Sequence, residues 1–112
     1  MEFLNKVEIQ GVVGRAEVSS YNGRSVCNFM VVTEAVFSDR NGNSVVEPTW
    51  WNLTAWDGGL SASSCNIFEL RKGQWVHAVG RLRVRKYVDG AGCERMAHDV
   101  LVCSLEILSQ EG

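Results

Sequence analysis

The residues best suited to bind a ligand lie in PTWWNLTAW, residues 48–56, which holds three of the four tryptophans in the chain. Side chains alternate between the two faces of a β-strand. If this segment is a strand, one face carries Trp51 with two aliphatic residues, which is an ordinary core face. The other face carries Trp50 and Trp56 beside an asparagine and a threonine. Two indoles among polar side chains suit neither a dry core nor a plain hydrated surface, so this face is a candidate for stacking on a flat ligand.

A second candidate group is basic. Residues 71–88 include six Lys or Arg and no Asp or Glu, although the net charge of the chain is −2. Alternation predicts one basic face here, formed by Arg81, Arg83, Arg85 and Tyr87. The opposite face is small and apolar, as a barrel interior requires, and consists of Val76, Ala78, Gly80, Leu82 and Val84. Adjacent guanidinium groups repel one another, so either a bound anion or carboxylates on a neighbouring strand must accompany them.

Aromatic rings beside arginine and lysine are what single-stranded nucleic acid requires. Each base offers a flat face that stacks on an aromatic side chain for about 1–3 kcal/mol whatever the sequence, and the phosphates pair with cations. Phe37, next to a polar loop, adds a further aromatic side chain. The aromatic and basic faces together predict nucleic-acid binding. Both DNA and RNA remain open, because stacking does not detect the 2′-hydroxyl group.

Five predicted strands have to position these side chains. Alternating apolar residues and turn signals place the strands at residues 5–20, 25–37, 45–56, 74–88 and 95–108. An Asn-Gly pair at residues 22–23 is a strong hairpin signal, and Pro48 favours an edge position for the third strand. A short helix is expected within residues 57–73, ending at Gly73. Its apolar side consists of Leu60, Ile67, Phe68 and Leu70.

Three strands, one short helix and a two-strand hairpin follow one another in the order of an OB barrel. The predicted fold class is therefore all-β, a five-stranded OB-fold barrel with one short helix between strands 3 and 4. An open sandwich has the same strand count, but the single helix favours the barrel. A length of 112 residues fits one domain over residues 1–112.

Several classes of function are disfavoured by the composition. No apolar run approaches the roughly 20 residues that cross a bilayer, and the N-terminal segment lacks the pattern of a secretion signal, so we expect a cytoplasmic protein without membrane contact. Four cysteines without a CxxC pair and two histidines give no usable zinc spacing. We therefore expect reduced, mostly buried thiols, no metal and no other cofactor. No nucleophile–base pair, phosphate loop or paired carboxylates are found, so an enzyme is not expected.

Five blocks of the sequence, running from about Asn5 to Leu108, resemble a known family. In order they are NKVEIQGVVGRAEV, NGRSVCNFMVVTE, TWWNLTAW, LRKGQWVHAVGRLRVRKY and DGAGCER. Their order and spacing are similar to those of the bacterial single-stranded DNA-binding proteins, the SSB family. The resemblance implies a homotetrameric OB-fold protein. It also implies sequence-independent binding and protection of single-stranded DNA during replication, recombination or repair.

The resemblance further implies which side chains contact DNA. The stacking aromatics of the family fall on Phe37, Trp50, Trp56 and Tyr87. Its strand-four cations fall on Arg83, Arg85 and Lys86, and Lys6 lies in its N-terminal Asn-Lys motif. Arg81, on the same predicted basic face, completes the candidate set.

The family usually continues beyond the barrel with a Gly/Pro/Gln-rich tail and an acidic tip that recruits replication and repair enzymes. The sequence ends at ILSQEG, so partners recruited by such a tail are not expected. A second candidate function remains open, because the primosomal adaptor PriB resembles a tailless SSB domain and acts mainly through protein contacts. The full set of aromatic residues favours DNA binding.

Overall fold

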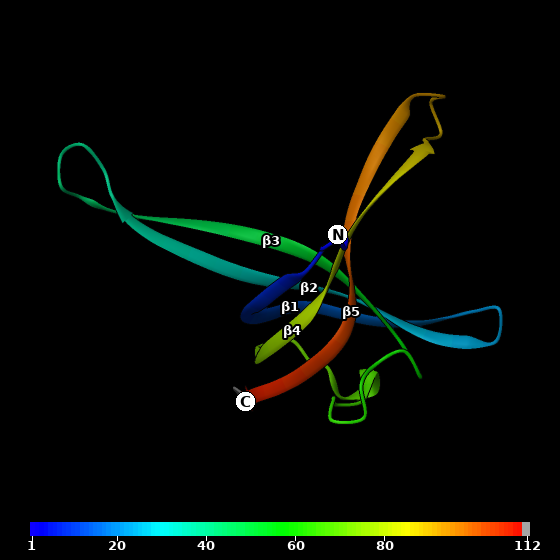
Figure 1. Cartoon of the computed structure of the whole chain (residues 1–112). Coiled ribbons are helices and arrows are strands. Elements are labelled where there is room, and N and C mark those ends of the chain that lie inside the picture. The colour runs from blue at the N-terminus through cyan, green and yellow to red at the C-terminus, as the bar shows by residue number, and fades with distance from the viewer. Residues whose placement is uncertain (111–112) are drawn as a thin grey trace.

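The computed structural model describes residues 1–110, and its five strands follow the predicted segments. They are β1 (Val7–Tyr21), β2 (Arg24–Ser38), β3 (Ser44–Trp56), β4 (Gln74–Val88) and β5 (Glu94–Gln110). The strands close into a barrel in the order β1-β2-β3-β5-β4, with one short parallel pairing between β3 and β5 (Figure 1). The prediction of an all-β, five-stranded barrel is confirmed.

The interior of the barrel collects one alternating face from every strand. Leu53 and Ala55 of β3 and Val76 and Ala78 of β4 are almost fully buried, as alternation predicts. They belong to a cluster of buried apolar residues to which all five strands contribute. Complete burial of one large aliphatic side chain stabilises the fold by about 1.5–3 kcal/mol. This cluster therefore holds the strands that carry the candidate site.

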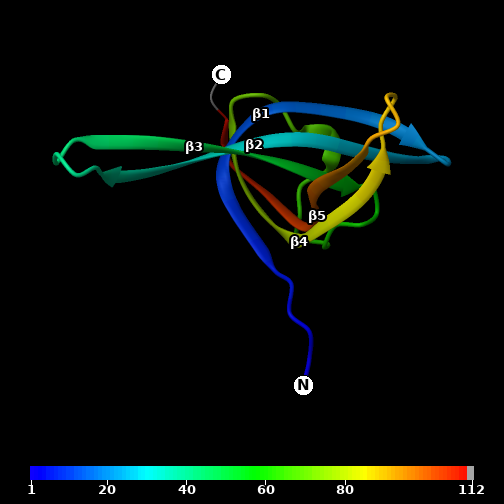
Figure 2. The ribbon, with the colours of Figure 1, turned by 90° about the horizontal axis from the view of Figure 1, so that it is seen from above.

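Two hairpins continue beyond the barrel as free-standing arms. β3 pairs with β5 only at Leu53 and Thr54, and β4 pairs with β1 only as far as Gly80. The outer parts of these strands therefore pair only within their own hairpins. We call residues 33–49 the β2–β3 arm and residues 82–99 the β4–β5 arm. Figures 1 and 2 show that the arms leave the barrel in different directions, with the β1–β2 turn on the side away from the β2–β3 arm.

Turn chemistry closes each hairpin. Asn22 and Gly23 have positive φ angles of 51° and 79°, as a two-residue Asn-Gly turn needs. The two arms end in loops of one design. In each loop the side chain of Asp39 or Asp89 accepts hydrogen bonds from the backbone N–H groups two and four residues further on. Pro48 lies in the edge segment of β3 that pairs with β2 alone, as expected.

Two residues predicted for the barrel interior lie outside it. Leu82 and Val84 are 40% and 47% exposed, although they continue the buried face of β4. The pairing of β4 with β5 shifts register between Val79 and Gly80, and beyond this point β4 enters the arm. The alternation of side chains persists there, but no second layer of strands covers the apolar face. The prediction was wrong for these two residues.

The predicted helix is a single 3₁₀ turn, Ile67–Glu69. Asn66 caps it, because its side chain accepts a hydrogen bond from the N–H of Phe68 while its own N–H donates to the carboxylate of Glu69. Ile67 and Leu70 are buried, but Phe68 is exposed. One turn is too short to align all the predicted apolar residues on one side, so the expectation for Phe68 was wrong.

The thiols are less buried than predicted. Cys27 is buried and Cys65 is half-buried, whereas Cys93 at the tip of the β4–β5 arm and Cys103 on β5 are exposed. Burial raises the pKa of the Cys27 thiol. Burial, helped by the negative charge of Glu69, raises the pKa of Cys65 to about 11. Cys93 and Cys103 are therefore the cysteines most accessible to reagents in solution.

Candidate nucleic-acid interface

A groove runs between the outer face of β2 and β3 and the basic face of the β4–β5 arm. Two hollows of about 260 and 420 Å³ follow this groove. Asn28, Thr54 and Arg85 line both hollows, which therefore lie next to each other. Polar side chains on one wall and a guanidinium on the other fit a polyanion that carries hydrogen-bonding bases.

Trp56 lies at the end of β3, where the groove meets the β1–β2 turn. The guanidinium carbon of Arg24 lies 5.0 Å from the centroid of the indole, and Tyr21 meets the indole edge-on with 6.3 Å between ring centroids. A cation over one face of a tryptophan attracts the ring and restricts its orientation. Trp56 is half-buried and still lines the larger hollow. Its ring is therefore held in place yet open to a ligand.

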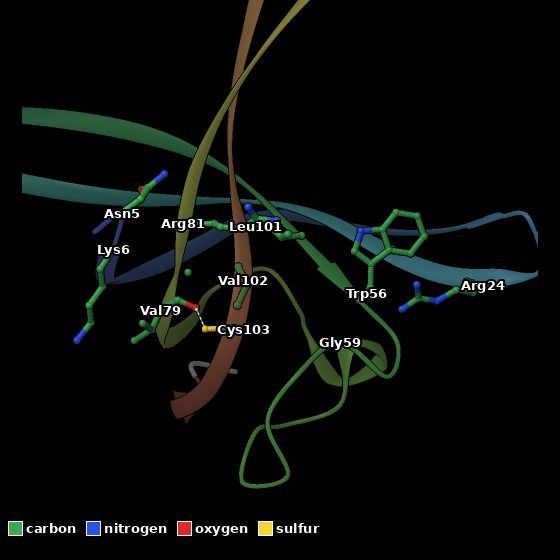
Figure 3. A pocket seen from close by; sticks show the side chains of 11 residues that line it. Asn5, Lys6, Arg24, Trp56, Gly59, Val79, Arg81, Leu101, Val102 and Cys103 are labelled. Atoms are coloured by element: carbon green, nitrogen blue, oxygen red, sulfur yellow. Dashed lines mark hydrogen bonds between the residues drawn. The ribbon is translucent and has the colours of Figure 1, made fainter. Parts of the chain in front are cut away.

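A third cavity, of about 450 Å³, shares Trp56 with the groove (Figure 3). Its floor is largely apolar and comes from β4 and β5, and its charged residues are Lys6, Arg24 and Arg81. No acidic residue lines it. Among residues 1–110, none of these three cations has a carboxylate within ion-pair distance. The cavity therefore extends the groove with uncompensated positive charge.

Asn5 explains how Lys6 reaches this cavity. The amide of Asn5 donates a hydrogen bond to the carbonyl of Leu82 at 2.8 Å and accepts one from the N–H of Leu82 at 3.1 Å. The side chain thus imitates a neighbouring strand and fixes the N-terminal segment beside β4. Alternation along β4 did not select Lys6, which the family resemblance alone had indicated.

Phe37 belongs to the β2–β3 arm and Trp50 lies at its base, and the two rings face different sides of this hairpin. The register pairs Trp50 with Val32 and Phe37 with Val45, and residues five apart on one strand point to opposite faces. Trp50 is 54% exposed, and its indole packs over Gly14, where an added Cβ would lie 2.5 Å from the ring. Phe37 is exposed near the tip of the arm. A ligand that contacts both rings has to pass around the arm.

The side chains of the predicted basic face differ in their exposure and in the cavities that they line. Arg81 lines the third cavity. The side chain of Arg83 is only 26% exposed, whereas that of Arg85 is 63% exposed. Tyr87 is exposed further out on the same face, and Lys86 is exposed on the opposite face of the arm. The structure thus brings Arg81, Arg83 and Arg85 to the groove system and leaves Lys86 outside its walls.

Asp99 of β5, which the sequence analysis missed, engages two of these arginines. Its carboxylate accepts hydrogen bonds from Nε and Nη2 of Arg83 at 3.1 and 2.7 Å, and Oδ2 lies 3.8 Å from Nη2 of Arg85. The Thr54 hydroxyl lies 2.8 Å from the same Oδ2. Burial acts to raise the pKa of Asp99, but the hydrogen bonds from Arg83 and Thr54 outweigh it, so the pKa lies below its ordinary value. For Arg83, the explanation by a neighbouring carboxylate is correct.

A signal for Asp99 was present in the sequence. The hairpin loop at residues 89–93 fixes the register of its two strands, and counting back from that loop pairs Asp99 with Arg83. No comparable signal marks Tyr21 and Asn28 of the groove or Arg24 of the third cavity, because they reach these sites only when the barrel closes. Alternation along single strands therefore found the groove but not all of its lining.

No cluster of three or more His, Cys, Asp or Glu side chains within residues 1–110 could hold a metal ion. No helix in the same range is long and apolar enough to cross a membrane.

Related chains are found among proteins of known type. The sequence model of the single-strand binding protein family matches residues 4–108. The single-stranded DNA-binding proteins of Neisseria meningitidis serogroups A and B are each 36% identical to this chain over 107 residues. Those alignments cover 94% of this chain, and this chain spans 60% of the length of the curated relatives.

Solved structures share the fold. A Plasmodium falciparum SSB in complex with ssDNA matches with a TM-score of 0.83 and 24% identity, covering 97% of this chain and 98% of that one. A deletion mutant of the single-stranded DNA binding protein from Thermus aquaticus matches with a TM-score of 0.77 and 18% identity, covering 97% and 52% of the two chains. These likenesses confirm the predicted OB-fold.

Proposed function

The chain belongs to the single-strand binding protein family, and from this premise we propose that it binds and protects single-stranded DNA without regard to sequence. The observation that carries the proposal is the groove in which a restrained Trp56 lies between the polar wall with Arg85 and the basic cavity with Lys6 and Arg81. Such a groove stacks bases of any identity and neutralises the phosphates between them. The cellular roles are replication, recombination or repair.

The proposed path of the DNA follows the exposed rings and cations. Bases stack on Trp56 inside the groove and on Trp50 over β1, while Arg85 and the cations of the third cavity take the phosphates. Because Phe37 and Trp50 face opposite sides of the β2–β3 arm, the strand wraps around this arm rather than lying along it. The proposed contact residues are Lys6, Phe37, Trp50, Trp56, Arg81, Arg85, Lys86 and Tyr87, while Arg83 lines the groove paired with Asp99.

The proposal includes a homotetramer in which the first strands of different subunits meet. Residues 7–10 of β1 pair with β4 but not with β2, so within residues 1–110 one edge of this segment has no paired strand. Exposed strand edges readily pair with another chain. Trp75 and Leu108 are also partly exposed on the surface of the barrel. Light scattering should give the mass of four chains at micromolar concentration, and a monomer mass would contradict this arrangement.

The remaining parts of the proposal describe a binding module. Residues 1–112 form one OB-fold domain that acts in the cytoplasm, without a metal or cofactor and without catalysing a reaction. A contiguous core to which all five strands contribute supports the single domain. The preferred ligand is DNA rather than RNA. The relative affinities for oligo-dT and oligo-dU measure that preference.

Fluorescence anisotropy of labelled oligonucleotides tests the proposal. The expected result is tight binding of oligo-dT and of mixed single-stranded sequences, with little binding of a duplex of the same length. Affinity should fall as salt rises, because each phosphate contact on a single strand contributes a log–log slope of about −0.7. Equal binding of duplex and single strands, or none of either, would overturn the proposal. Failure to bind any nucleic acid would favour the PriB-like adaptor instead.

A further inference from the structure

We propose that Asp99 is a positioning residue that locks Arg83 into the protein and leaves Arg85 as the arginine of this pair that binds phosphate. This inference rests on the proposed binding of single-stranded DNA and specifies which charges of the groove take part. It assigns different roles to Arg83 and Arg85, which look equivalent in the sequence.

The contact between Arg83 and Asp99 is a two-point fork. Both carboxylate oxygens accept hydrogen bonds from the guanidinium, at 3.1 and 2.7 Å, and the two side chains are only 26% and 10% exposed. Bidentate arginine–carboxylate pairs are strong and fixed in direction. A phosphate that took Arg83 from Asp99 would leave a largely buried carboxylate without its partner, which is costly. The guanidinium of Arg83 is therefore already bound to Asp99 before DNA enters the groove.

Arg85 is held much more loosely. Its Nη2 lies 3.8 Å from Oδ2 of Asp99, which is too far for a hydrogen bond, and its side chain is 63% exposed. Arg85 lines both hollows of the groove. The negative charge of Asp99 attracts it toward the groove without using its donors. Arg85 therefore keeps its N–H groups free for a phosphate.

Thr54 gives Asp99 a second function in positioning the β4–β5 arm. Thr54 is buried on β3, and its hydroxyl lies 2.8 Å from Asp99 and 3.2 Å from the side-chain oxygen of Asn28. A hydroxyl has one proton, and the charged carboxylate is the stronger acceptor, so Thr54 donates to Asp99. β3 and β5 share only two paired positions. The Thr54–Asp99 bond therefore adds a side-chain connection where the arm leaves the barrel.

The salt dependence of binding to oligo-dT separates these roles, with four variants compared to the unchanged chain. Asp99→Asn keeps the shape but removes the charge, which frees Arg83 and should steepen the log–log slope by about 0.7 per subunit. Arg85→Met should flatten the slope by about 0.7. The double variant Arg83→Met with Asp99→Asn removes a neutral pair and should keep the original slope. Glu106→Gln, on the same strand but outside the groove, makes the same change in net charge as Asp99→Asn and should leave the slope unchanged.

Three results would overturn the inference. The first is an unchanged slope in Asp99→Asn. The second is a slope that flattens in the double variant as much as in Arg85→Met, since Arg83 would then bind phosphate itself. The third is equal steepening by Glu106→Gln, which would reduce the effect to net charge. Melting curves identify any variant that fails to fold, and the Arg85→Met result stands independently of the Asp99 variants. Loss of all binding in the unchanged chain would instead contradict the proposed function.

Discussion

At the scale of single residues, the immediate neighbours of each tryptophan decide what it does. Trp51 is half-buried, packs against the core and donates its indole N–H to the hydroxyl of Thr33 at 2.9 Å. Trp50 and Trp56 lie on the other face of β3, and each keeps ring surface open to solvent or to a hollow. One strand thus separates a structural indole from two candidate binding indoles.

Alanine variants should show this separation. Trp50→Ala and Trp56→Ala should each weaken binding of single-stranded DNA by about 1–3 kcal/mol, because each removes one stacking ring. Trp51→Ala should instead lower the free energy of unfolding by up to about 3 kcal/mol, because it opens space beside the core. Chemical denaturation and anisotropy titrations measure the two effects. Equal losses of stability in all three variants would refute the assignment of faces.

The absence of a side chain at Gly14 leaves the space in which the indole of Trp50 packs. Gly14→Ala should push the indole from its position, because the new Cβ would lie 2.5 Å from the ring. We expect DNA affinity to fall by up to about 1–3 kcal/mol, the value of one stacked base. Gly90→Ala is the matched control, because nothing lies within 4 Å of an added Cβ there. If both variants bind DNA as tightly as the unchanged chain, Trp50 does not depend on this contact.

At the scale of elements, the groove exists because the β4–β5 arm rises beside the outer face of β3. The links between this arm and β3 include the two paired positions of β3 with β5 and the bond from Thr54 to Asp99. The apolar cavity beyond Trp56 lies where the barrel meets the base of the arm. The Asp99 network and this cavity can each be tested without changing Trp50 or Trp56.

The link through Asp99 should depend on pH in the acid range. The pKa of Asp99 is lowered in the folded chain, so its contribution to stability is complete above the unfolded value of about 3.9 and is lost as pH falls through the folded value. Asp99→Asn should therefore destabilise the fold at neutral pH, by about 1–3 kcal/mol for hydrogen bonds to charged groups. The difference from the unchanged chain should shrink below about pH 4. Denaturation curves at pH 7 and at acid pH measure it, and a constant difference would contradict the account.

Cys103 reports on occupancy of the third cavity. It lines this cavity and is exposed, whereas the exposed Cys93 lies at the tip of the arm, away from it. A saturating oligo-dT should slow alkylation of Cys103 by a maleimide and leave Cys93 reactive. Mass spectrometry of peptides containing each cysteine provides the measurement. Undiminished labelling of Cys103 in the DNA complex would exclude the cavity from the DNA path.

At the scale of the whole molecule, the barrel, the faces of its strands and a hairpin turn were predicted, whereas the point where β4 leaves the barrel and the cross-strand partner of Arg83 were not. Period-two alternation identified the core residues Leu53 and Val76, and the Asn-Gly pair identified a hairpin turn. Leu82 and Val84 obey the same alternation, yet only the complete barrel shows that β4 has left it by that point. The pairing of Arg83 with Asp99 required the register of a hairpin rather than one strand.

The central claim is that Trp50 and Trp56 stack on the bases of single-stranded DNA. The most direct measurement is the intrinsic tryptophan emission of the unlabelled protein during titration with oligo-dT and with duplex DNA. We predict saturable quenching by oligo-dT that is reduced in both Trp50→Ala and Trp56→Ala, with far weaker quenching by the duplex. Emission that does not respond to oligo-dT, or that responds equally to the duplex, would contradict the claim.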